Sequence, residues 1–327
     1  MKRTSMRRAI VPGIAALALL LSACGDDADG DDEDVATGGS IECLTVDQLI
    51  ELWGPDSTIT NWNELDPEFP DQEISLFGPG TDSGTYDYMA AEVVDPDADE
   101  PATRSDYEAS EDDNVLVEGV ANTDGATGYF GYTYYEQNAD KLQAVAIDSG
   151  NGCVEPSAET AQSGEYTPLA RPLFIYVSKS SYEDNEAVQE YVDYYINNLE
   201  QIAEVGQYIP LSDELYSETQ SELESLGGSG ATGTSGEVVV DGSSTVYPMS
   251  VAAQELLNGE NPDVQVTVGE AGTGGGFEVF CTGDTDISDA SRPIEEDEIA
   301  VCEENGVEYI ELQVATDALT VVVNPNF

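Results

Sequence analysis

The sequence contains no histidine and very few basic residues. Its 327 residues include nine Lys and Arg against 67 Asp and Glu, which gives a formal net charge of −58 at pH 7. Four of the nine basic residues lie within the first eight positions, and the others are Arg104, Lys141, Arg171, Lys179 and Arg292. Because nucleic-acid phosphates are bound by stripes of basic side chains, we do not expect a nucleic-acid partner.

The lack of histidine also limits the chemistry. A Ser-His-Asp hydrolase is excluded, and metal-dependent phosphoryl transfer would need clusters of His and Asp. A metal site is not expected either, because the sequence has no Cys-x-x-Cys spacing. We therefore expect no metal, no cofactor and no catalytic residue. The enzymatic alternative is a phosphatase with the Asp-Ser-Gly-Thr stretch at 82–85 as its nucleophile loop.

The excess of acidic residues has two interpretations. Intrinsic disorder is one, since high net charge opposes collapse. However, 40% of the residues are apolar, 17 are Tyr, and the acidic residues are dispersed along the chain. A folded chain with an acidic, well-hydrated surface fits this composition better, and a saline habitat is a reasonable hypothesis for such a surface. The length indicates two lobes.

The first 40 residues predict export and a tether. A basic start precedes the apolar run 9–21, which is too short to be a comfortable membrane span. The run ends in Leu-Ser-Ala-Cys at 21–24, which matches a bacterial lipoprotein signal in which Cys24 takes the lipid. An ordinary signal peptide with a chance cysteine is the alternative. Residues 25–40 are rich in Asp and Gly and predict a disordered tether.

Four cysteines follow Cys24, namely Cys43, Cys153, Cys281 and Cys302. An even number in an exported chain indicates two disulfides, and four cysteines allow three connectivities. Cys43–Cys153 together with Cys281–Cys302 is the preferred pairing, because each pair then lies within one half of the chain.

One hydroxyl-rich turn joins a predicted strand to a predicted helix. Residues 73–77 alternate as a short strand does, the turn Phe-Gly-Pro-Gly-Thr-Asp-Ser-Gly-Thr occupies 77–85, and residues 86–93 are compatible with a helix. Free N–H groups and the dipole at a helix start favour an anion, and Ser83 and Thr85 add hydroxyl donors. Ser and Asp before a helix are also ordinary caps.

Three more turns of this kind lie in the last third of the chain. They are loop 241–248 between strand 238–240 and helix 249–258, loop 269–276 between strand 264–268 and a helix from about Phe277, and loop 285–293 before helix 295–304. In an open α/β sheet such turns gather at the carboxyl ends of the strands, where ligands bind. The four turns together predict an oxyanion site.

Other elements are predicted from periodicity and turn residues. They are helix 45–53 with Thr45 as N-cap, an acidic loop 95–113, a strand or buried turn at 115–121, a glycine and aromatic segment 122–132 with close backbone approaches, strand 142–147, the lobe-linking strand 171–177, helices 185–206 and 213–226, and strands 309–314 and 319–323. Residues 226–236, mostly Gly, Ser and Thr, predict a flexible linker.

The set of loops resembles the phosphate-binding lipoproteins of phosphate ABC transporters, the PstS family. The resemblance rests on Asp-Gly-Ser-Ser-Thr-Val-Tyr-Pro at 241–248, Gly-Thr-Gly-Gly-Gly-Phe at 272–277, Asp-Ile-Ser-Asp-Ala-Ser-Arg-Pro at 286–293, Gly-Pro-Gly-Thr-Asp-Ser-Gly-Thr at 78–85 and Ala-Arg-Pro-Leu-Phe-Ile-Tyr-Val at 170–177. The combination is specific, although each motif alone is not. It implies an α/β fold of the two-lobed periplasmic-binding-protein type (type II, Venus-flytrap).

The order of these stretches differs from that of the family, in which the Gly-Ser-Ser-Thr strand comes first and the Asp-Ser-Gly-Thr loop lies in the middle. The chain therefore resembles a circular permutant, natural or engineered. The expected parts are a signal peptide 1–24, a tether 25–40, one lobe at 41–168 (the family's second), the other lobe at 169–226 with 238–327, and a linker 227–237 that joins the family's original termini. Only the crossing at 171–177 would then join the lobes covalently.

The resemblance implies that neutral donors hold one phosphate between the lobes. Carried over motif by motif, these donors are Ser83, the Gly84 N–H, Thr85, Ser244, Thr245, the Val246 backbone, Thr273 and Ser291. Helix starts and hydroxyls stabilise an anion while adding little net charge. Individual Ser and Thr side chains can instead be caps, which we expect for at least two of them.

The expected charged partners are an arginine and an aspartate. Part of the family has an Arg just before its Ser-Gly-Thr loop, but none stands near Pro79 here, so we expect Arg292 to supply the fork for two phosphate oxygens. A surface ion pair is the alternative for Arg292. A buried carboxylate would accept the proton of HPO4²⁻ and repel unprotonated sulfate. Asp82 is the first choice and Asp289 the second, because Ser291 occupies the family's usual aspartate position.

The implied function is high-affinity extracytoplasmic binding of inorganic phosphate for delivery to an ABC importer. The implied partners are phosphate, the permease subunits of that importer and the membrane, through the lipid on Cys24, and a monomer is expected. A binding protein for another oxyanion, such as sulfate or molybdate, is one alternative. A surface lipoprotein with no transport role is another.

Overall fold

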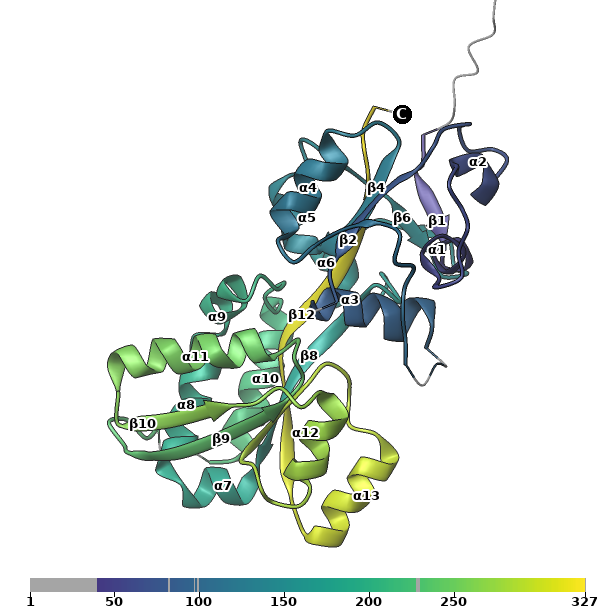
Figure 1. Cartoon of the computed structure of the whole chain (residues 1–327). Helices are drawn as coiled ribbons and strands as arrows, with labels where there is room; N and C mark the ends of the chain where they lie inside the picture. The colour runs from purple at the N-terminus through teal and green to yellow at the C-terminus, as the bar shows by residue number, and fades with distance from the viewer. Residues whose placement is uncertain (1–39, 82, 97, 99, 228–229, 327) are drawn as a thin grey trace, which may run out of the picture. The chain divides into compact units, whose positions relative to one another are not determined.

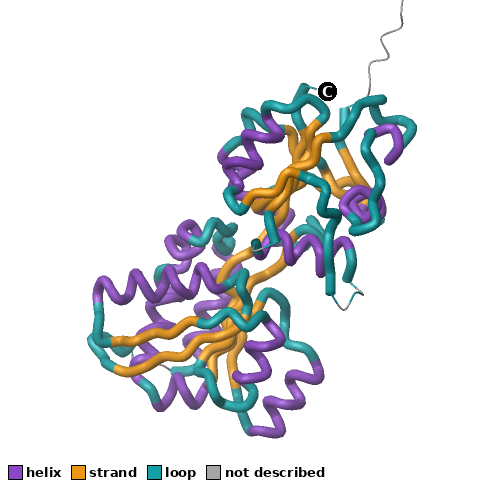
Figure 2. Tube along the Cα trace, viewed as in Figure 1, coloured by secondary structure: helices purple, strands orange, loops and turns teal. Residues whose placement is uncertain are grey.

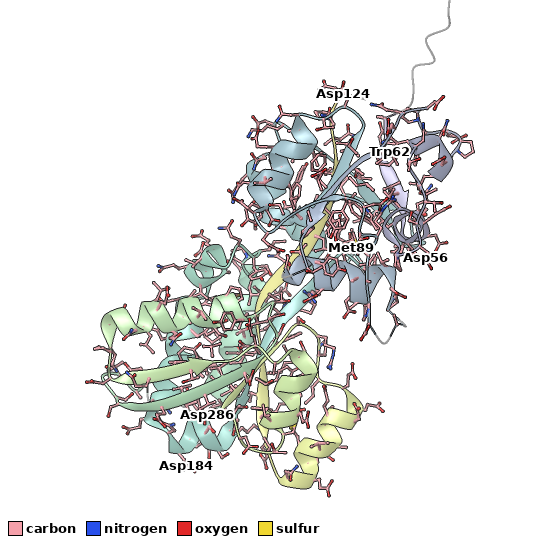
Figure 3. The ribbon with its side chains drawn as sticks, viewed as in Figure 1. Asp56, Trp62, Met89, Asp124, Asp184 and Asp286 are labelled. Carbon is pink, nitrogen blue, oxygen red and sulfur yellow. A yellow bond between two sulfur atoms is a disulfide. The ribbon has the colours of Figure 1, made fainter. Side chains whose placement is uncertain are left out.

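The computed structural model describes residues 40–326 except 82, 97, 99, 228 and 229. The expected signal peptide, Cys24, nearly all of the tether and Asp82 therefore lie outside the described residues. The described chain forms two lobes with separate buried cores (Figure 1). Trp62 and Met89 are fully buried in the core of the first lobe, whereas the acidic side chains of Asp56, Asp124 and Asp184 are exposed (Figure 3).

The first lobe is built mainly from residues 41–168. Its elements are β1 (Cys43–Thr45), α1 (Val46–Trp53), α2 (Trp62–Leu65), β2 (Ser75–Pro79), α3 (Gly84–Tyr88), the π-helix η1 (Met89–Val94), β3 (Glu108–Ser110), α4 (Asp113–Ala121), β4 (Ala126–Gly131), α5 (Tyr132–Gln137), β5 (Gln143–Ala144), β6 (Ala146–Asp148), β7 (Cys153–Val154) and α6 (Ala158–Gln162). As predicted, α1 begins after Thr45, because Thr45 and Gln48 cap each other's backbone N–H groups.

The second lobe is built from residues 169–318. Its elements are β8 (Ala170–Ser178), α7 (Lys179–Asp184), α8 (Glu186–Asn197), α9 (Leu199–Val205), α10 (Asp213–Ser225), β9 (Gly236–Gly242), α11 (Tyr247–Glu260), β10 (Val264–Val268), α12 (Thr273–Phe280), β11 (Ile287–Ala290), α13 (Glu296–Asn305) and most of β12 (Tyr309–Val323). Along β8, Ile175 and Val177 pack into one core and Phe174 and Tyr176 into another. Successive side chains of a strand face opposite sides, so helices cover both faces of the sheet (Figure 2).

One nine-stranded sheet runs through both lobes. Its strand order is β10-β9-β11-β8-β12-β4-β2-β3, with β5 paired to β12, while β1, β6 and β7 form a separate small sheet. Residues 309–318 of β12 pair antiparallel with β8, and residues 319–323 pair antiparallel with β4. The strand therefore crosses from the second lobe to the first.

This second crossing corrects the sequence-based prediction of a single one at 171–177. The predicted strands 309–314 and 319–323 are one strand, because the residues between them are buried and keep pairing past a bulge near Gln313. Leu319, Val321 and Val323 pack in the core of the first lobe, so the end of the chain does not belong to the second lobe as expected.

Two predicted elements of the first lobe differ in type or extent. The strand or turn expected at 115–121 is the helix α4, because Asp112 caps its first turn and Leu116, Val117 and Val120 lie on its buried face. The strand expected at 142–147 is divided between β5 and β6, which belong to different sheets.

Two predicted helices of the second lobe also differ. The helix expected at 185–206 is interrupted at Asn198, which separates α8 from α9. The helix expected from about Phe277 begins at Thr273, so the glycines after Thr273 form its first turn instead of a loop.

The disulfides and the linker complete the fold. Cys43 is bonded to Cys153 and Cys281 to Cys302, which is the preferred pairing. The linker is fastened at its end, because the buried Glu190 carboxylate accepts hydrogen bonds from Gly233 N at 2.9 Å, Thr234 N at 2.8 Å and Thr234 Oγ1 at 2.7 Å. Residues 233 and 234 of the predicted linker are thus hydrogen-bonded to α8, and β9 begins at Gly236.

Candidate functional site

Two adjoining cavities lie where loops of the two lobes meet. The larger, about 430 Å³, is lined by Thr81, Ser83, Gly84, Thr85, Asp87, Tyr208, Ser244, Thr245, Tyr247, Pro248, Glu270 and Asp317. The smaller, about 110 Å³, is lined by Asp87, Tyr88, Ala91, Glu92, Arg171, Ser243, Ser244, Thr245, Gly272, Thr273 and Ser291. Asp87, Ser244 and Thr245 line both cavities. Two further hollows beside α10, of about 360 and 790 Å³, contain none of the turn residues that were predicted to bind an anion.

The first lobe contributes the start of α3. Ser83 is the N-cap, and its Oγ accepts a hydrogen bond of 3.2 Å from Thr85 N. Its hydroxyl is therefore a cap, as the alternative reading held, yet it also faces the larger cavity and keeps a proton to donate. Gly84 lies so close to the opposite lobe that a Cβ there would be 3.3 Å from Thr245 Oγ1. The two lobes thus meet at Gly84 and Thr245.

The second lobe contributes loop 243–247 between β9 and α11. The buried Ser243 Oγ accepts a hydrogen bond from Thr245 N at 3.2 Å, and Ser243 O accepts from Val246 N at 3.1 Å and Tyr247 N at 3.0 Å. Ser244 is exposed and lines both cavities. The Val246 amide, expected as a ligand donor, is already bonded within the loop, and its side chain is in the core.

Thr273 and Ser291 lie together in the smaller cavity. Their hydroxyl oxygens are 3.1 Å apart, and Ser291 N donates to Thr273 Oγ1 at 3.2 Å. Thr273 is the first residue of α12, and Ser291 follows β11. The strands that precede them, β10 and β11, lie parallel on either side of β9, so the turns after these strands bring the two hydroxyls to the same edge of the sheet.

Among the described residues that line the two cavities, Arg171 is the one cation, and it lines the smaller cavity. From β8, its Nη2 donates to Thr245 Oγ1 at 2.9 Å, and its Nε lies 3.2 Å from Asp317 Oδ2. Its guanidinium also stacks 3.8 Å from the centre of the Tyr88 ring. Arg171 was predicted only as part of the crossing strand and of the motif at 170–177, not as a ligand of the anion. The small number of basic residues in the sequence was the signal that could have indicated Arg171 as a candidate for the anion site.

Arg292 is placed differently from the expectation. Its two terminal nitrogens donate to the two oxygens of Glu298 at 2.9 and 2.8 Å, and its Nε lies 3.2 Å from Glu295. The guanidinium fork is thus filled by a carboxylate, and Arg292 does not line either cavity. The ion pair considered as the alternative is what the structure contains.

The carboxylates of the site also differ from those expected. Asp289 is fully buried on β11 and lines neither cavity; Ser250 Oγ donates to its Oδ1 at 2.9 Å, while Oδ2 has no partner among the described residues. Burial raises the pKa of Asp289 to about 8. Asp87 and Asp317 do line the larger cavity. Burial raises the pKa of each, and the neighbouring Arg171 partly offsets this rise.

Two further features are absent from the described part of the chain. None of its helices combines the length and the apolar composition that a membrane span requires. Nor do three or more His, Cys, Asp or Glu side chains gather there as metal ligands would.

Known proteins resemble this chain in sequence. A profile of the PBP superfamily domain matches residues 28–198 and 227–327. Protein SphX of Synechocystis is 46% identical over 178 residues, which are 54% of this chain and 52% of that protein. The phosphate-binding protein PstS of Staphylococcus saprophyticus is 33% identical over 189 residues, 57% of this chain and 56% of that protein. The chain thus spans about half the length of the curated relatives it matches.

Solved structures resemble it in fold. A phosphate-binding protein of a phosphate ABC transporter from Streptococcus pneumoniae aligns with a TM-score of 0.60 and 21% identity, covering 77% of this chain and 89% of that one. A possible phosphate-binding protein from Planctomyces limnophilus aligns with a TM-score of 0.53 and 42% identity, covering 57% and 65%. The expected two-lobed α/β fold is confirmed. Since the superfamily profile matches well over half of its residues, this chain belongs to the PBP (periplasmic-binding-protein) superfamily.

Proposed function

We propose that this protein binds inorganic phosphate outside the cytoplasmic membrane and delivers it to an ABC importer. The observation that carries the proposal is the gathering of hydroxyls from both lobes around two adjoining cavities. The partly buried Arg171 lines the smaller cavity and donates to Thr245 Oγ1. The names of the relatives support phosphate as the ligand and binding, not catalysis, as the activity. Delivery to a permease rests on the resemblance of the five sequence motifs to the binding lipoproteins of phosphate ABC transporters.

The ligand would bridge the lobes. The proposed donors are Ser83, the Gly84 N–H and Thr85 from the first lobe, and Ser244, Thr245, Thr273, Ser291 and Arg171 from the second. Hydroxyls and amides aimed at an oxyanion form charge-assisted hydrogen bonds without adding positive charge, and the guanidinium fork suits a pair of oxygens. The Val246 amide could contribute only if its bond to Ser243 O opened. Arg292 would first have to leave Glu298.

Selectivity over sulfate would come from a carboxylate that accepts the proton of HPO4²⁻. Asp87 is the best-placed of the described aspartates, because it lines both cavities and is not held by a salt bridge as Asp317 is. We retain Asp82 as a candidate for the selective carboxylate on sequence grounds. Asp289 lines neither cavity, so it could act on the anion only through the residues between them. A sulfate dianion has no proton for such a carboxylate and would be repelled.

The remaining expectations are part of the same proposal. We propose a lipid anchor at Cys24, a monomer, and a permuted order in which linker 227–237 joins the original termini. Alignments that each follow about half of this chain and half of a relative agree with a rearranged order. The domain limits are adjusted only at the end, where residues 319–326 join the first lobe.

Isothermal titration of the purified protein with phosphate and with sulfate tests the proposal. Saturable binding of phosphate, with sulfate at least about a hundredfold weaker, is expected, a difference of roughly 3 kcal/mol. Tighter binding of sulfate or molybdate than of phosphate would identify that anion as the ligand. Heat from neither anion would contradict a binding protein for oxyanions, and turnover of p-nitrophenyl phosphate would point to an enzyme.

A further inference from the structure

The segment 207–210, between α9 and α10, is bonded to both lobes. Its contacts with the first lobe are Thr133 Oγ1 to Gln207 O at 2.8 Å and Gln162 Nε2 to Pro210 O at 2.6 Å. Its contacts with the crossing strand β12 are two backbone hydrogen bonds of 3.0 Å between Ile209 and Thr316. Thr316 directly precedes Asp317, the partner of Arg171. The segment is therefore fastened at the junction of the lobes.

Tyr208 extends from this segment to the proposed binding loop. Its hydroxyl donates to Thr245 O at 2.7 Å, and its side chain lines the larger cavity. Burial raises the pKa of the Tyr208 hydroxyl far above its ordinary value, so the group stays protonated and donating. Thr245 is consequently held twice, by Tyr208 at its carbonyl and by Arg171 at its hydroxyl.

The backbone at Gln207 has an uncommon conformation. Among the described non-glycine residues it alone has a positive φ, of 62°. Its N and Nε2 both donate to Glu204 O, at 3.2 and 3.1 Å, and its carbonyl oxygen accepts a hydrogen bond from Thr133 Oγ1. These bonds hold a turn that a non-glycine residue seldom adopts, and the next residue is Tyr208. Such backbone conformations cost free energy, and they persist where several surrounding contacts hold them.

We propose that Tyr208 is a positioning residue for anion binding, which holds loop 243–247 through the Thr245 carbonyl and links that loop to the first lobe through the segment 207–210. The inference rests on the proposed function. The inference goes beyond the proposed function because it assigns a role to a residue that does not donate a hydrogen bond to the anion. The hydroxyl proton of Tyr208 is already donated to Thr245 O. Closure of the lobes and the shape of the binding loop are coupled by this segment.

The matched variants are Tyr208→Phe and Tyr182→Phe. Each removes one partly buried tyrosine hydroxyl bond of 2.7 Å in the second lobe. The bond of Tyr182 goes to Asp193, and neither residue lines the two cavities of the proposed site. In phosphate titrations we expect Tyr208→Phe to weaken binding about three- to tenfold, the effect of one hydrogen bond, and Tyr182→Phe to leave it unchanged. The double variant Thr133→Val with Tyr208→Phe should lose less affinity than the product of the fold-losses of the two single variants, because both residues act through segment 207–210.

Amide hydrogen exchange in the absence of ligand gives a readout that does not depend on phosphate. The Val246 and Tyr247 amides, which donate to Ser243 O, should exchange faster in Tyr208→Phe and at the wild-type rate in Tyr182→Phe. Unchanged exchange and unchanged affinity in Tyr208→Phe would overturn the inference while the proposed function stood. Faster exchange in a protein that binds no phosphate would support the positioning role and contradict the proposed ligand.

Discussion

Arg171 Nη2 donates a hydrogen bond of 2.9 Å to Thr245 Oγ1 and so joins a crossing strand to the loop before α11. The same guanidinium is held by Asp317 on the other crossing strand, its partner in the strand register, and stacks on Tyr88 from the first lobe. The cation therefore lies at the junction of the two lobes.

Arg171 should matter more for anion binding than Arg292. We expect Arg171→Lys, which keeps the charge but loses the fork, to weaken phosphate binding about 10- to 100-fold, the range for a charge-assisted hydrogen bond. Arg292→Met should change affinity by less than about twofold, because Glu298 already fills its fork. Calorimetric titration of both variants checks this, with circular dichroism as the folding control. The reverse ranking would restore Arg292 as the ligand.

Asp87→Asn should narrow the preference for phosphate over sulfate. An amide cannot accept the HPO4²⁻ proton as a carboxylate does, and it no longer repels a dianion. Competition calorimetry at pH 8, where HPO4²⁻ predominates, measures the ratio of the two affinities, and Asp82→Asn is the parallel variant. If only Asp82→Asn changes the ratio, the selective carboxylate is Asp82; if neither does, a carboxylate does not set the preference.

Asp289 should make the protein less stable as the pH rises. Its pKa is about 8 in the folded chain and 3.8 in a model peptide, so above pH 4 the unfolded chain loses a proton that the folded chain keeps. The contribution of Asp289 to the free energy of unfolding is therefore greatest below about pH 4. It falls by a few kcal/mol between about pH 4 and pH 8. Urea melts of wild type and Asp289→Asn at pH 5 and 8.5 measure it. Equal pH dependence in both proteins would contradict the assignment.

The two disulfides should differ in reactivity. Cys153 is exposed, whereas Cys281 and Cys302 are at most 1% exposed and lie in a core. Mild reduction followed by alkylation and mass spectrometry should therefore label Cys43 and Cys153 first. Replacing this pair by Ser should also lower the free energy of unfolding by about 4 kcal/mol, because the bond closes a loop of 110 residues. Earlier labelling of Cys281 would contradict the burial.

Salt should stabilise the fold. With a net charge of −58, the folded chain concentrates repulsion that the expanded chain relieves, and ions screen it. The melting temperature is expected to rise by several degrees between 0.1 and 2 M NaCl. Sodium chloride is the suitable salt, because sulfate both screens charge and competes for the site. A constant melting temperature would argue against an adaptation to saline conditions.

Features that depend on neighbours along the chain were predicted correctly from the sequence. The cap at Thr45, the strand 264–268 and the hydroxyl-rich turns before α3, α11 and α13 follow from residues a few positions apart, and local hydrogen bonds form them. The same local rules failed where burial decided between helix and strand, as at 115–121. They also failed at Asn198, which splits a periodic run.

The charged side chains that line the two cavities could not be identified from the local sequence. Arg171 and Arg292 are both followed by Pro and look alike in sequence. Arg292 is captured by Glu298, six residues away, whereas Arg171 is held by Asp317, 146 residues away, through the pairing of β8 with β12. That pairing, and the single strand β12 that joins both lobes, depend on contacts between distant segments. No local pattern specifies such contacts, so the position of the cation became visible only when the chain was folded.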